Sequence, residues 1–254
     1  MDMGLIRQML GLPELLDVPN ALVIEPHPDD NEVGAGGTVK LLAERNVPVA
    51  YLTVTDGRLG SEDPGMSAEE MVRLRMGERQ RANQLLGVQS SFNLGFEDGG
   101  DWTESALMQV LVPLIRQFRP ALVMTVDPWT PYEAHPDHVK TGRAVASSLI
   151  YCQNGIYLKG QGDPWTVPQV AFYGSAYPNT YIDVTETWET KLQAMKAHTS
   201  QFDNADWDLF SGFLTAEAER LYREHVSPSA SGYAEAFKVL SPRQLHFFPE
   251  AYKG

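Results

Sequence analysis

Short apolar runs alternate with helical patterns four times in the first 150 residues, and this alternation limits the possible folds more than any other feature of the chain. Each run is compact and apolar, as expected of a strand that is buried on both faces. Strands that alternate with helices form a mostly parallel sheet with helices on both faces. We therefore predict an α/β sandwich of three layers. The predicted strands are 21–25, 47–55, 92–94 and 121–126, and the predicted helices are 38–45, 67–86, 104–118 and 138–151.

The rest of the chain has weaker patterns. A length of 254 residues suits one sizeable α/β domain, and no repeat, low-complexity tract or linker divides the sequence. We therefore expect a single domain over residues 1–254. The weaker predictions are a strand at 169–173 and helices at 5–10, 188–202, 216–222 and 233–240.

Charge and apolar content argue against several kinds of partner. The formal net charge is −13, and a surface this acidic repels phosphate backbones, so we expect no nucleic acid partner. No apolar run reaches 18 residues, so we expect no membrane-spanning helix. The lone cysteine, Cys152, cannot form a disulfide within the chain, and the N-terminus lacks a signal-peptide pattern. These features predict a cytoplasmic protein.

Two similar tetrapeptides follow two of the predicted strands. His-Pro-Asp-Asp occupies residues 27–30, and His-Pro-Asp-His occupies residues 135–138. Ligands of parallel sheets bind at the carboxyl ends of the strands, so we expect the two segments to meet there. A catalytic divalent metal commonly takes three protein ligands and leaves one position for water. His27, Asp30 and His138 would supply that set for Zn²⁺, although such a site accepts other divalent metals.

The two remaining polar residues of these tetrapeptides suit acid–base and electrostatic roles. Asp29 would act as the general base on a water whose pKa the metal lowers. His135 would polarise the substrate carbonyl or stabilise the oxyanion. Either tetrapeptide alone also fits a turn or a helix cap. Because both follow strands of one predicted sheet, we favour an active site.

These residues resemble the PIG-L/LmbE-like de-N-acetylases, and the resemblance extends over most of the chain. The further matches are Arg75-Met-Gly-Glu with Leu-Gly-Val at 86–88, Leu-Gly-Phe-Glu-Asp-Gly at 94–99, and His198-Thr-Ser-Gln. The resemblance implies a Rossmann-like fold and a metal-dependent amidase, usually with zinc. The implied reaction removes the acetyl group from a small N-acetylglucosaminyl compound and releases acetate.

The resemblance also assigns residue roles. It implies the same roles as the residue types do. The metal ligands are His27, Asp30 and His138, the base is Asp29, and the oxyanion-side histidine is His135. Arg75 and Asp98 map onto positions that contact the sugar. Simpler interpretations remain open, because Arg75 suits a surface ion pair with Glu78 and Asp98 suits a turn. We interpret His198 as a structural helix residue.

One subgroup of the family is more similar to this chain than the common form. The chain departs from the common form, because Pro26 precedes His27 and Asn31 and Glu32 follow the aspartate pair. Proline before the histidine and the D-D-x-x-x-G pattern from Asp29 to Gly34 resemble the diacetylchitobiose deacetylases. In that subgroup a histidine near the C-terminus of a neighbouring subunit helps to build the site of a hexamer. His246 falls near that position, although a packed core histidine is the simpler interpretation. The resemblance therefore implies a homo-oligomer, a hexamer or a trimer.

Two other functions remain as alternatives. The Gly-Ala-Gly-Gly segment at 34–37 suggests a nucleotide-dependent Rossmann oxidoreductase, but it lacks the G-x-G-x-x-G spacing, and a helix start packed against a strand explains it better. A non-catalytic sugar-binding protein on the same scaffold is the second alternative. The sequence also leaves the sugar open among free N-acetylglucosamine, a chitin disaccharide and a glucosaminyl-thiol precursor.

Overall fold

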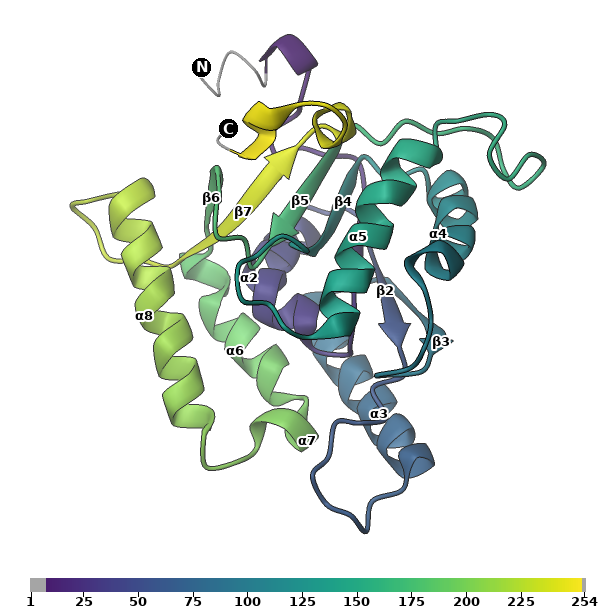
Figure 1. Ribbon diagram of the computed structural model, residues 1–254. Coiled ribbons are helices and arrows are strands. Elements are labelled where there is room, and N and C mark those ends of the chain that lie inside the picture. The colour runs from purple at the N-terminus through teal and green to yellow at the C-terminus, as the bar shows by residue number, and fades with distance from the viewer. Residues whose placement is uncertain (1–7, 253–254) are drawn as a thin grey trace.

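The structure is a computed structural model that describes residues 8–252, and its centre is one seven-stranded sheet (Figure 1). The strand order is β3-β2-β1-β4-β5-β7-β6. The pairs among the first five strands are parallel, and β7 runs antiparallel to both β5 and β6. The predicted mostly parallel sheet is therefore confirmed. The strands are β1 (Ala21–Glu25), β2 (Val49–Thr55), β3 (Ser90–Phe96), β4 (Leu122–Val126), β5 (Gln169–Tyr173), β6 (Thr180–Asp183) and β7 (Ala234–Leu240).

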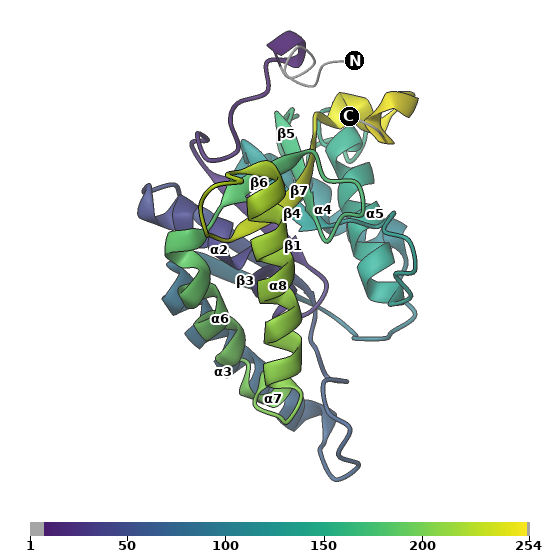
Figure 2. The ribbon, with the colours of Figure 1, turned by 90° about the vertical axis from the view of Figure 1, so that its left-hand side faces the viewer.

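Helices cover both faces of the sheet, as Figures 1 and 2 show. One face packs against α2 (Asp30–Glu44), α3 (Ala68–Leu86) and α6 (Trp188–Lys196), and the other against α4 (Glu104–Phe118) and α5 (Pro136–Tyr151). The three predicted layers are therefore confirmed. The remaining helices are α7 (Thr199–Phe202), α8 (Trp207–His225) and the 3-10 turns η1 (Thr185–Thr187), η2 (Pro242–Leu245) and η3 (Pro249–Tyr252). Residues 8–10 are helical, and the other half of the helix predicted at 5–10 lies outside the described residues.

Strand β1 shows why the sequence has continuous apolar runs. Ala21 and Val23 belong to the core under α2 and α3, whereas Leu22 and Ile24 belong to the core under α4 and α5. Successive side chains of a strand point to opposite faces, so a strand covered on both faces needs apolar residues at consecutive positions. Strand β4 is buried along its whole length in the same way.

Helix α2 begins at Asp30, eight residues before the predicted start at 38. Its glycines allow close packing. A Cβ on Gly34 would lie 2.2 Å from Cδ2 of Tyr173, and one on Gly37 would lie 2.8 Å from Cβ of Val184. The glycine-rich segment is therefore part of a helix that packs tightly against β5 and its neighbours. This agrees with the prediction of a helix start packed against a strand.

Two predictions for the C-terminal half are wrong. Residues 234–240 form strand β7, not a helix, because Phe237 and Val239 alternate into one core and Leu240 into the other. The helix predicted at 188–202 is interrupted at residues 197–198 and forms α6 and α7. The helix predicted at 216–222 is the last part of the longer α8, and β6 was not predicted.

The strand order positions the functional residues. The chain adds β2 and β3 on one side of β1 and then returns to place β4 on the other side. The loops that follow β1 and β4 therefore separate at the carboxyl edge, and ligands of open α/β sheets bind in such a crevice. Within residues 8–252, no helix is both long enough and apolar enough to cross a bilayer.

Candidate active site

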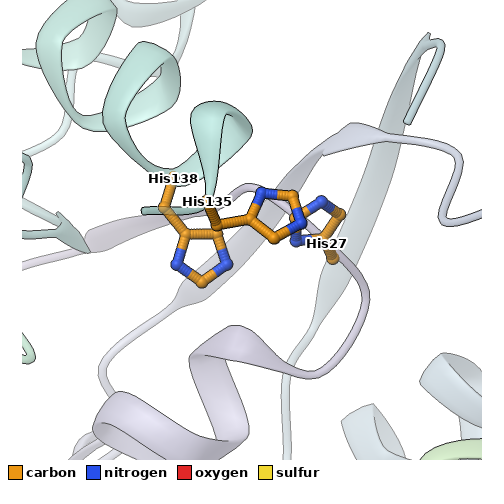
Figure 3. A group of neighbouring side chains, drawn as sticks. All are labelled: His27, His135 and His138. Carbon is orange, nitrogen blue, oxygen red and sulfur yellow. The ribbon is translucent and has the colours of Figure 1, made fainter. Parts of the chain in front are cut away.

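Three histidines from the two tetrapeptides gather at this crevice (Figure 3). His27 lies in the loop after β1, His135 is the N-cap residue of α5, and His138 lies in the first turn of α5. The centroid of the His27 ring is 4.5 Å from that of His135 and 5.3 Å from that of His138. The His135 and His138 rings stack at 4.8 Å. The expected meeting of the two segments is therefore observed.

Three carboxylates surround His27. Nδ1 of its ring lies 3.2 Å from Oδ2 of Asp30, and Nε2 lies 3.3 Å from Asp98 and 3.5 Å from Asp137. Nε2 is buried and makes no hydrogen bond of good geometry to any residue in 8–252. Burial alone would lower the pKa of His27, but the carboxylates of Asp137, Asp30 and Asp98 together raise it well above 6.5. The cluster therefore has an excess of negative charge.

Asp30 joins the two segments. Its Oδ2 accepts the backbone N–H of His27 at 2.8 Å, and its Oδ1 lies 3.4 Å from Nε2 of His138. Burial would raise the pKa of Asp30, but the hydrogen bonds and charge of His27 outweigh it and hold the pKa at about 2. Nδ1 of His138 lies 3.2 Å from Glu133, which also accepts the backbone N–H of His135 at 2.8 Å. Glu133 thus orients both histidines of α5.

Asp29 has a different environment from its neighbour. It precedes α2 with the unusual backbone angle φ 138°, and its Oδ2 accepts a hydrogen bond from Nη2 of Arg75 at 2.9 Å. Burial raises the pKa of Asp29 to about 6, although the Arg75 guanidinium opposes that rise. A carboxylate with a pKa near neutrality suits proton transfer.

His135 is held in one tautomer by the helix that it caps. Its Nδ1 accepts the backbone N–H of Asp137 at 3.3 Å, so the ring proton of the neutral form is on Nε2. Burial, followed by the charges of His27 and His138, lowers its pKa. His135 is therefore a neutral donor at pH 7.

Asp137 ties a second loop to the site. It is fully buried, its Oδ2 accepts the N–H of Gly99 at 2.8 Å, and its Oδ1 lies 2.8 Å from Nζ of Lys140. Nζ of Lys140 also donates to the carbonyl of Gly100 at 3.1 Å and lies over the Trp102 ring. The loop after β3, which contains Asp98, is thereby fixed against α5.

A cavity of about 380 Å³ opens beside the histidine cluster, a size within the range of small-molecule sites. Arg75 and Asp98 both belong to its wall, and contact of either residue with a sugar stays a prediction. Arg75 does not form the ion pair considered with Glu78, because Glu78 accepts hydrogen bonds from Thr199 and Ser200. The lining residues are His27, Asp29, Leu59, Gly60, Arg75, Asp98, Gly99, His135, Pro136 and Gln201.

The structure corrects the simpler interpretation of His246. The residue is exposed and ends η2, so it is not a packed core histidine. Strand β7 precedes it, and Leu240 at the end of β7 pairs with Val170 near the start of β5. His246 thus follows the amino edge of the parallel strands, whereas the histidine cluster lies at the carboxyl edge. Within the described chain, His246 takes no part in the cavity wall.

His198 is buried, but it is not the helix residue that was predicted. It lies between α6 and α7, with Nε2 at 3.4 Å from a carboxylate oxygen of Glu32. The residues that sequence reasoning missed are Glu133, Asp137 and Lys140. Asp137 belongs to the second tetrapeptide, so its position was the available signal. The contacts of Glu133 and Lys140 depend on how the loops pack.

The residues fit a divalent cation on structural grounds. Among residues 8–252, two groups have ligand atoms close enough to share one ion, His27 with His135 and His138, and His27 with Asp98 and Asp137. Neither group contains Asp30, so the predicted set of His27, Asp30 and His138 stays a prediction. The carboxylates that raise the proton affinity of His27 would equally stabilise a cation. Imidazole and carboxylate together suit zinc and several other divalent metals.

Fold and site together define the class of this protein. It is an α/β protein whose histidines and carboxylates gather at the carboxyl edge of a parallel sheet, where they could bind a metal. Residues 22–149 match the PIG-L family, "GlcNAc-PI de-N-acetylase". The chain is 36% identical to a diacetylchitobiose deacetylase of Thermococcus kodakarensis, over 93% of this chain and 88% of that protein. The chain belongs to the PIG-L family of deacetylases.

Two solved structures share the fold of this chain. An N,N'-diacetylchitobiose deacetylase from Pyrococcus horikoshii has a TM-score of 0.87 and 30% identity, over 97% of this chain and 94% of that one. A 4-carboxy-2-hydroxymuconate hydratase from Pseudomonas putida has a TM-score of 0.75 and 21% identity, over 88% of this chain and 97% of that one. The second likeness shows the fold alone, because one fold can carry several chemistries.

Proposed function

We propose that the chain hydrolyses the acetamide of an N-acetylglucosaminyl compound and releases acetate. The observation that carries the proposal is that both tetrapeptides meet at one cavity. Asp29 lies beside the cluster of His27, Asp30 and His138 but takes no part in the ion-pair contacts that join these three residues. Membership of a deacetylase family supports the same reaction. No comparison supports a nucleotide-dependent oxidoreductase, and a sugar-binding protein would not need a perturbed carboxylate at the cavity.

We assign His27, Asp30 and His138 as the ligands of a divalent metal, with zinc as the expected ion. Asp30 is ionised and directs one oxygen toward each histidine, at 3.2 and 3.4 Å. The other candidate ligands have further contacts, because Nδ1 of His135 accepts the N–H of Asp137, and Asp137 binds Lys140 and Gly99. In our proposal Nε2 of His135 serves the substrate and not the metal. When bound, the metal supplies Lewis acidity that polarises the acetyl carbonyl and makes water more acidic. Asp98 and Asp137, at 3.3 and 3.5 Å from Nε2 of His27, would help to orient that ring.

Asp29 and His135 carry out the remaining steps. Asp29 takes a proton from the attacking water as the bond between oxygen and the acetyl carbon forms. His135 directs its Nε2–H at the carbonyl oxygen as negative charge develops there. Asp29 then gives the proton to the amide nitrogen as the C–N bond breaks. The products are acetate and the free amino sugar.

The remaining parts of the site are also proposals. Asp98 lines the cavity and binds a sugar hydroxyl through its carboxylate. His246 is remote from the site of its own chain, so it acts in the site of a neighbouring copy within a homohexamer or trimer. Two relatives whose matches cover more than 90% of this chain are named as diacetylchitobiose deacetylases, and this neutral disaccharide is the first substrate to test. A single domain and a cytoplasmic location stay predictions.

The decisive experiment measures acetate release from a panel of N-acetyl sugars, with and without a chelator. The panel contains N-acetylglucosamine, diacetylchitobiose and a glucosaminyl-thiol precursor. We expect release from at least one sugar, loss of activity with chelator, and recovery when zinc is returned. Binding of a sugar without acetate release, or activity that a chelator leaves unchanged, would contradict the proposal. Titration with NAD tests the oxidoreductase alternative, and we expect no binding.

A further inference from the structure

Gln201 belongs to the wall of the cavity beside the histidine cluster. It lies in α7 and is half-buried. Its Nε2 donates to the carbonyl of Gly60 at 2.8 Å and to Oγ of Ser200 at 2.8 Å. An amide nitrogen of a glutamine side chain carries two hydrogens, so both donors of Gln201 are used within the protein.

These two contacts decide which way the amide of Gln201 faces. The nitrogen and the oxygen of a glutamine amide are nearly alike in size, so the hydrogen-bond network assigns them. A backbone carbonyl can only accept, so the atom that faces Gly60 is the nitrogen. None of residues 8–252 donates a hydrogen bond to the remaining atom, Oε1, which is accessible to solvent. Gln201 therefore presents an unused acceptor at the cavity wall.

A buried carboxylate on α3 holds the first turn of α7, which contains this amide. Glu78 is fully buried, and it accepts the hydroxyl of Thr199 at 2.7 Å and the hydroxyl of Ser200 at 2.6 Å. It also accepts the backbone N–H of Ser200 at 2.7 Å. Because the Ser200 hydroxyl donates to Glu78, its oxygen can accept from Gln201. Hydrogen bonds therefore run from α3 through α7 to the loop after β2 and restrict rotation of the amide.

The loop after β2 leaves room for the amide. A Cβ on Gly60 would lie 2.9 Å from Nε2 of Gln201, closer than real Cβ contacts, so a side chain at this position would displace the amide. Leu59, the preceding residue, belongs to the same wall and is 64% exposed. Small-molecule sites commonly combine apolar surface with a few aimed polar groups. Apolar carbon beside one fixed acceptor suits a sugar ring, which has C–H faces and hydroxyl donors at its rim.

We propose that Gln201 is a sugar-binding residue whose Oε1 accepts a hydrogen bond from one hydroxyl of the acetamide-bearing ring. This role rests on the proposed function, in which that ring occupies the cavity. A side chain that is already fixed loses little conformational entropy when the sugar binds. A ring without that hydroxyl would leave the acceptor unpaired, so the contact also discriminates between sugars. Gln201 takes no part in the proposed proton transfer, so its loss should raise KM and leave kcat nearly unchanged.

Deoxy sugars combined with Gln201→Met test the proposal as a double-mutant cycle. The probes are analogues of N-acetylglucosamine and diacetylchitobiose in which the acetamide-bearing ring lacks one hydroxyl at a time. The wild type should lose about tenfold in kcat/KM on the analogue that lacks the recognised hydroxyl. Gln201→Met should lose about tenfold on the parent sugar, mainly through KM, and lose no more on that analogue. A variant that keeps the full penalty for every missing hydroxyl would overturn the proposal.

Thr199→Val controls for a displaced α7. It removes one hydrogen bond to Glu78 and leaves both contacts of the Gln201 amide in place. The variant should have a lower Tm, because Glu78 loses a hydrogen-bond donor, while its penalty for each missing hydroxyl stays that of the wild type. If Thr199→Val and Gln201→Met lose the same penalty, Gln201 acts only through the position of α7, and the proposal is wrong.

Gln201→Asn covers the case in which Gln201→Met does not fold. Its amide is one methylene shorter, so the nitrogen cannot bond to Gly60 while the oxygen keeps its place, and the same penalty should be lost. A wild type that releases no acetate from any sugar would defeat the proposed function and this role with it. An active wild type whose hydroxyl discrimination is unchanged in both Gln201 variants would defeat this inference alone.

Discussion

Asp29 and Asp30 are neighbours in sequence with opposite electrostatic environments. Asp30 faces two imidazoles, and its pKa is held at about 2, whereas burial raises the pKa of Asp29 to about 6. Two carboxyl groups whose environments separate their pKa values commonly divide the work of binding and proton transfer. The difference arises because Asp30 begins α2 and turns toward His27, while the strained Asp29 turns toward Arg75.

The first prediction distinguishes proton transfer by Asp29 from metal binding by Asp30. Asp29→Asn should keep the metal and lower kcat by about 10²–10⁴-fold, because only the proton-transfer group is lost. Asp30→Asn should lose the metal, since it removes the charge between His27 and His138. Elemental analysis of each purified variant, together with its rate of acetate release, distinguishes the two outcomes. Full activity in Asp29→Asn would rule out the proposed mechanism.

At the scale of single residues, the sequence identified the main site residues but not all of the side chains that they contact. The tetrapeptides identified the three histidines that the fold brings together. Arg75 was compared with Glu78 because the two lie one helical turn apart, yet its partner Asp29 is 46 positions away. The role of Asp137 depends on a lysine in α5 and on a loop after β3. Such contacts depend on tertiary packing, and no local pattern encodes them.

At the scale of elements, strands were easier to predict than helix boundaries. Strands buried on both faces need apolar runs, so β1, β2 and β4 were recognised directly. The start of α2 was missed because its first eight residues contain three glycines, which are weak helix formers. The segment 234–240 has apolar residues at five of its seven positions, and a run this short does not separate a strand from a helix by its period.

The second prediction concerns the packing of α2. Gly34→Ala should lower the free energy of unfolding by about 1–3 kcal/mol or more, because the new methyl group would overlap the Tyr173 ring. Gly212 in α8 provides the control, since a Cβ there meets no atom of residues 8–252 within 4 Å. Gly212→Ala should raise stability by about 0.5–1 kcal/mol. Urea unfolding of both variants measures the difference, and a neutral Gly34→Ala would contradict the tight packing.

The third prediction concerns His198 at the junction of α6 and α7. Burial lowers its pKa in the folded protein, although the charges of Asp29 and Glu25 oppose that shift. The unfolded chain therefore binds the proton more tightly, with a pKa near 6.5. The contribution of His198 to stability is present above pH 6.5 and is lost as the pH falls.

Urea unfolding at pH 5, 6 and 7 checks this sign. Removal of the titrating group should make His198→Gln lose less stability than the wild type between pH 7 and pH 5. The difference cannot exceed about 1.4 kcal/mol per pH unit for one proton. His225→Gln, at the end of α8, controls for the loss of an imidazole as such. Equal slopes in the wild type and His198→Gln would refute the prediction.

At the scale of the whole molecule, the C-terminal segment has a surface that suits association. Phe247 is 94% exposed, and Phe248 and Tyr252 are more than half exposed beside His246. Exposed aromatic residues that lie close together commonly mark an interface. Because His246 is remote from the site of its own chain, its proposed role requires a second copy. The prediction of an oligomer therefore depends on one residue and can be tested through it.

The fourth prediction is complementation between two inactive chains. If each site takes Asp29 from one copy and His246 from its neighbour, His246→Ala and Asp29→Asn should each lower activity. Mixed oligomers contain sites with both native residues. For random equal mixing in a closed ring, about a quarter of the sites should be native, so activity should return toward that fraction. Acetate release from the mixed and the separate variants measures it, with light scattering to establish the mass of the assembly. A mixture no more active than the mean of its two parents would mean that His246 does not act in a neighbouring site.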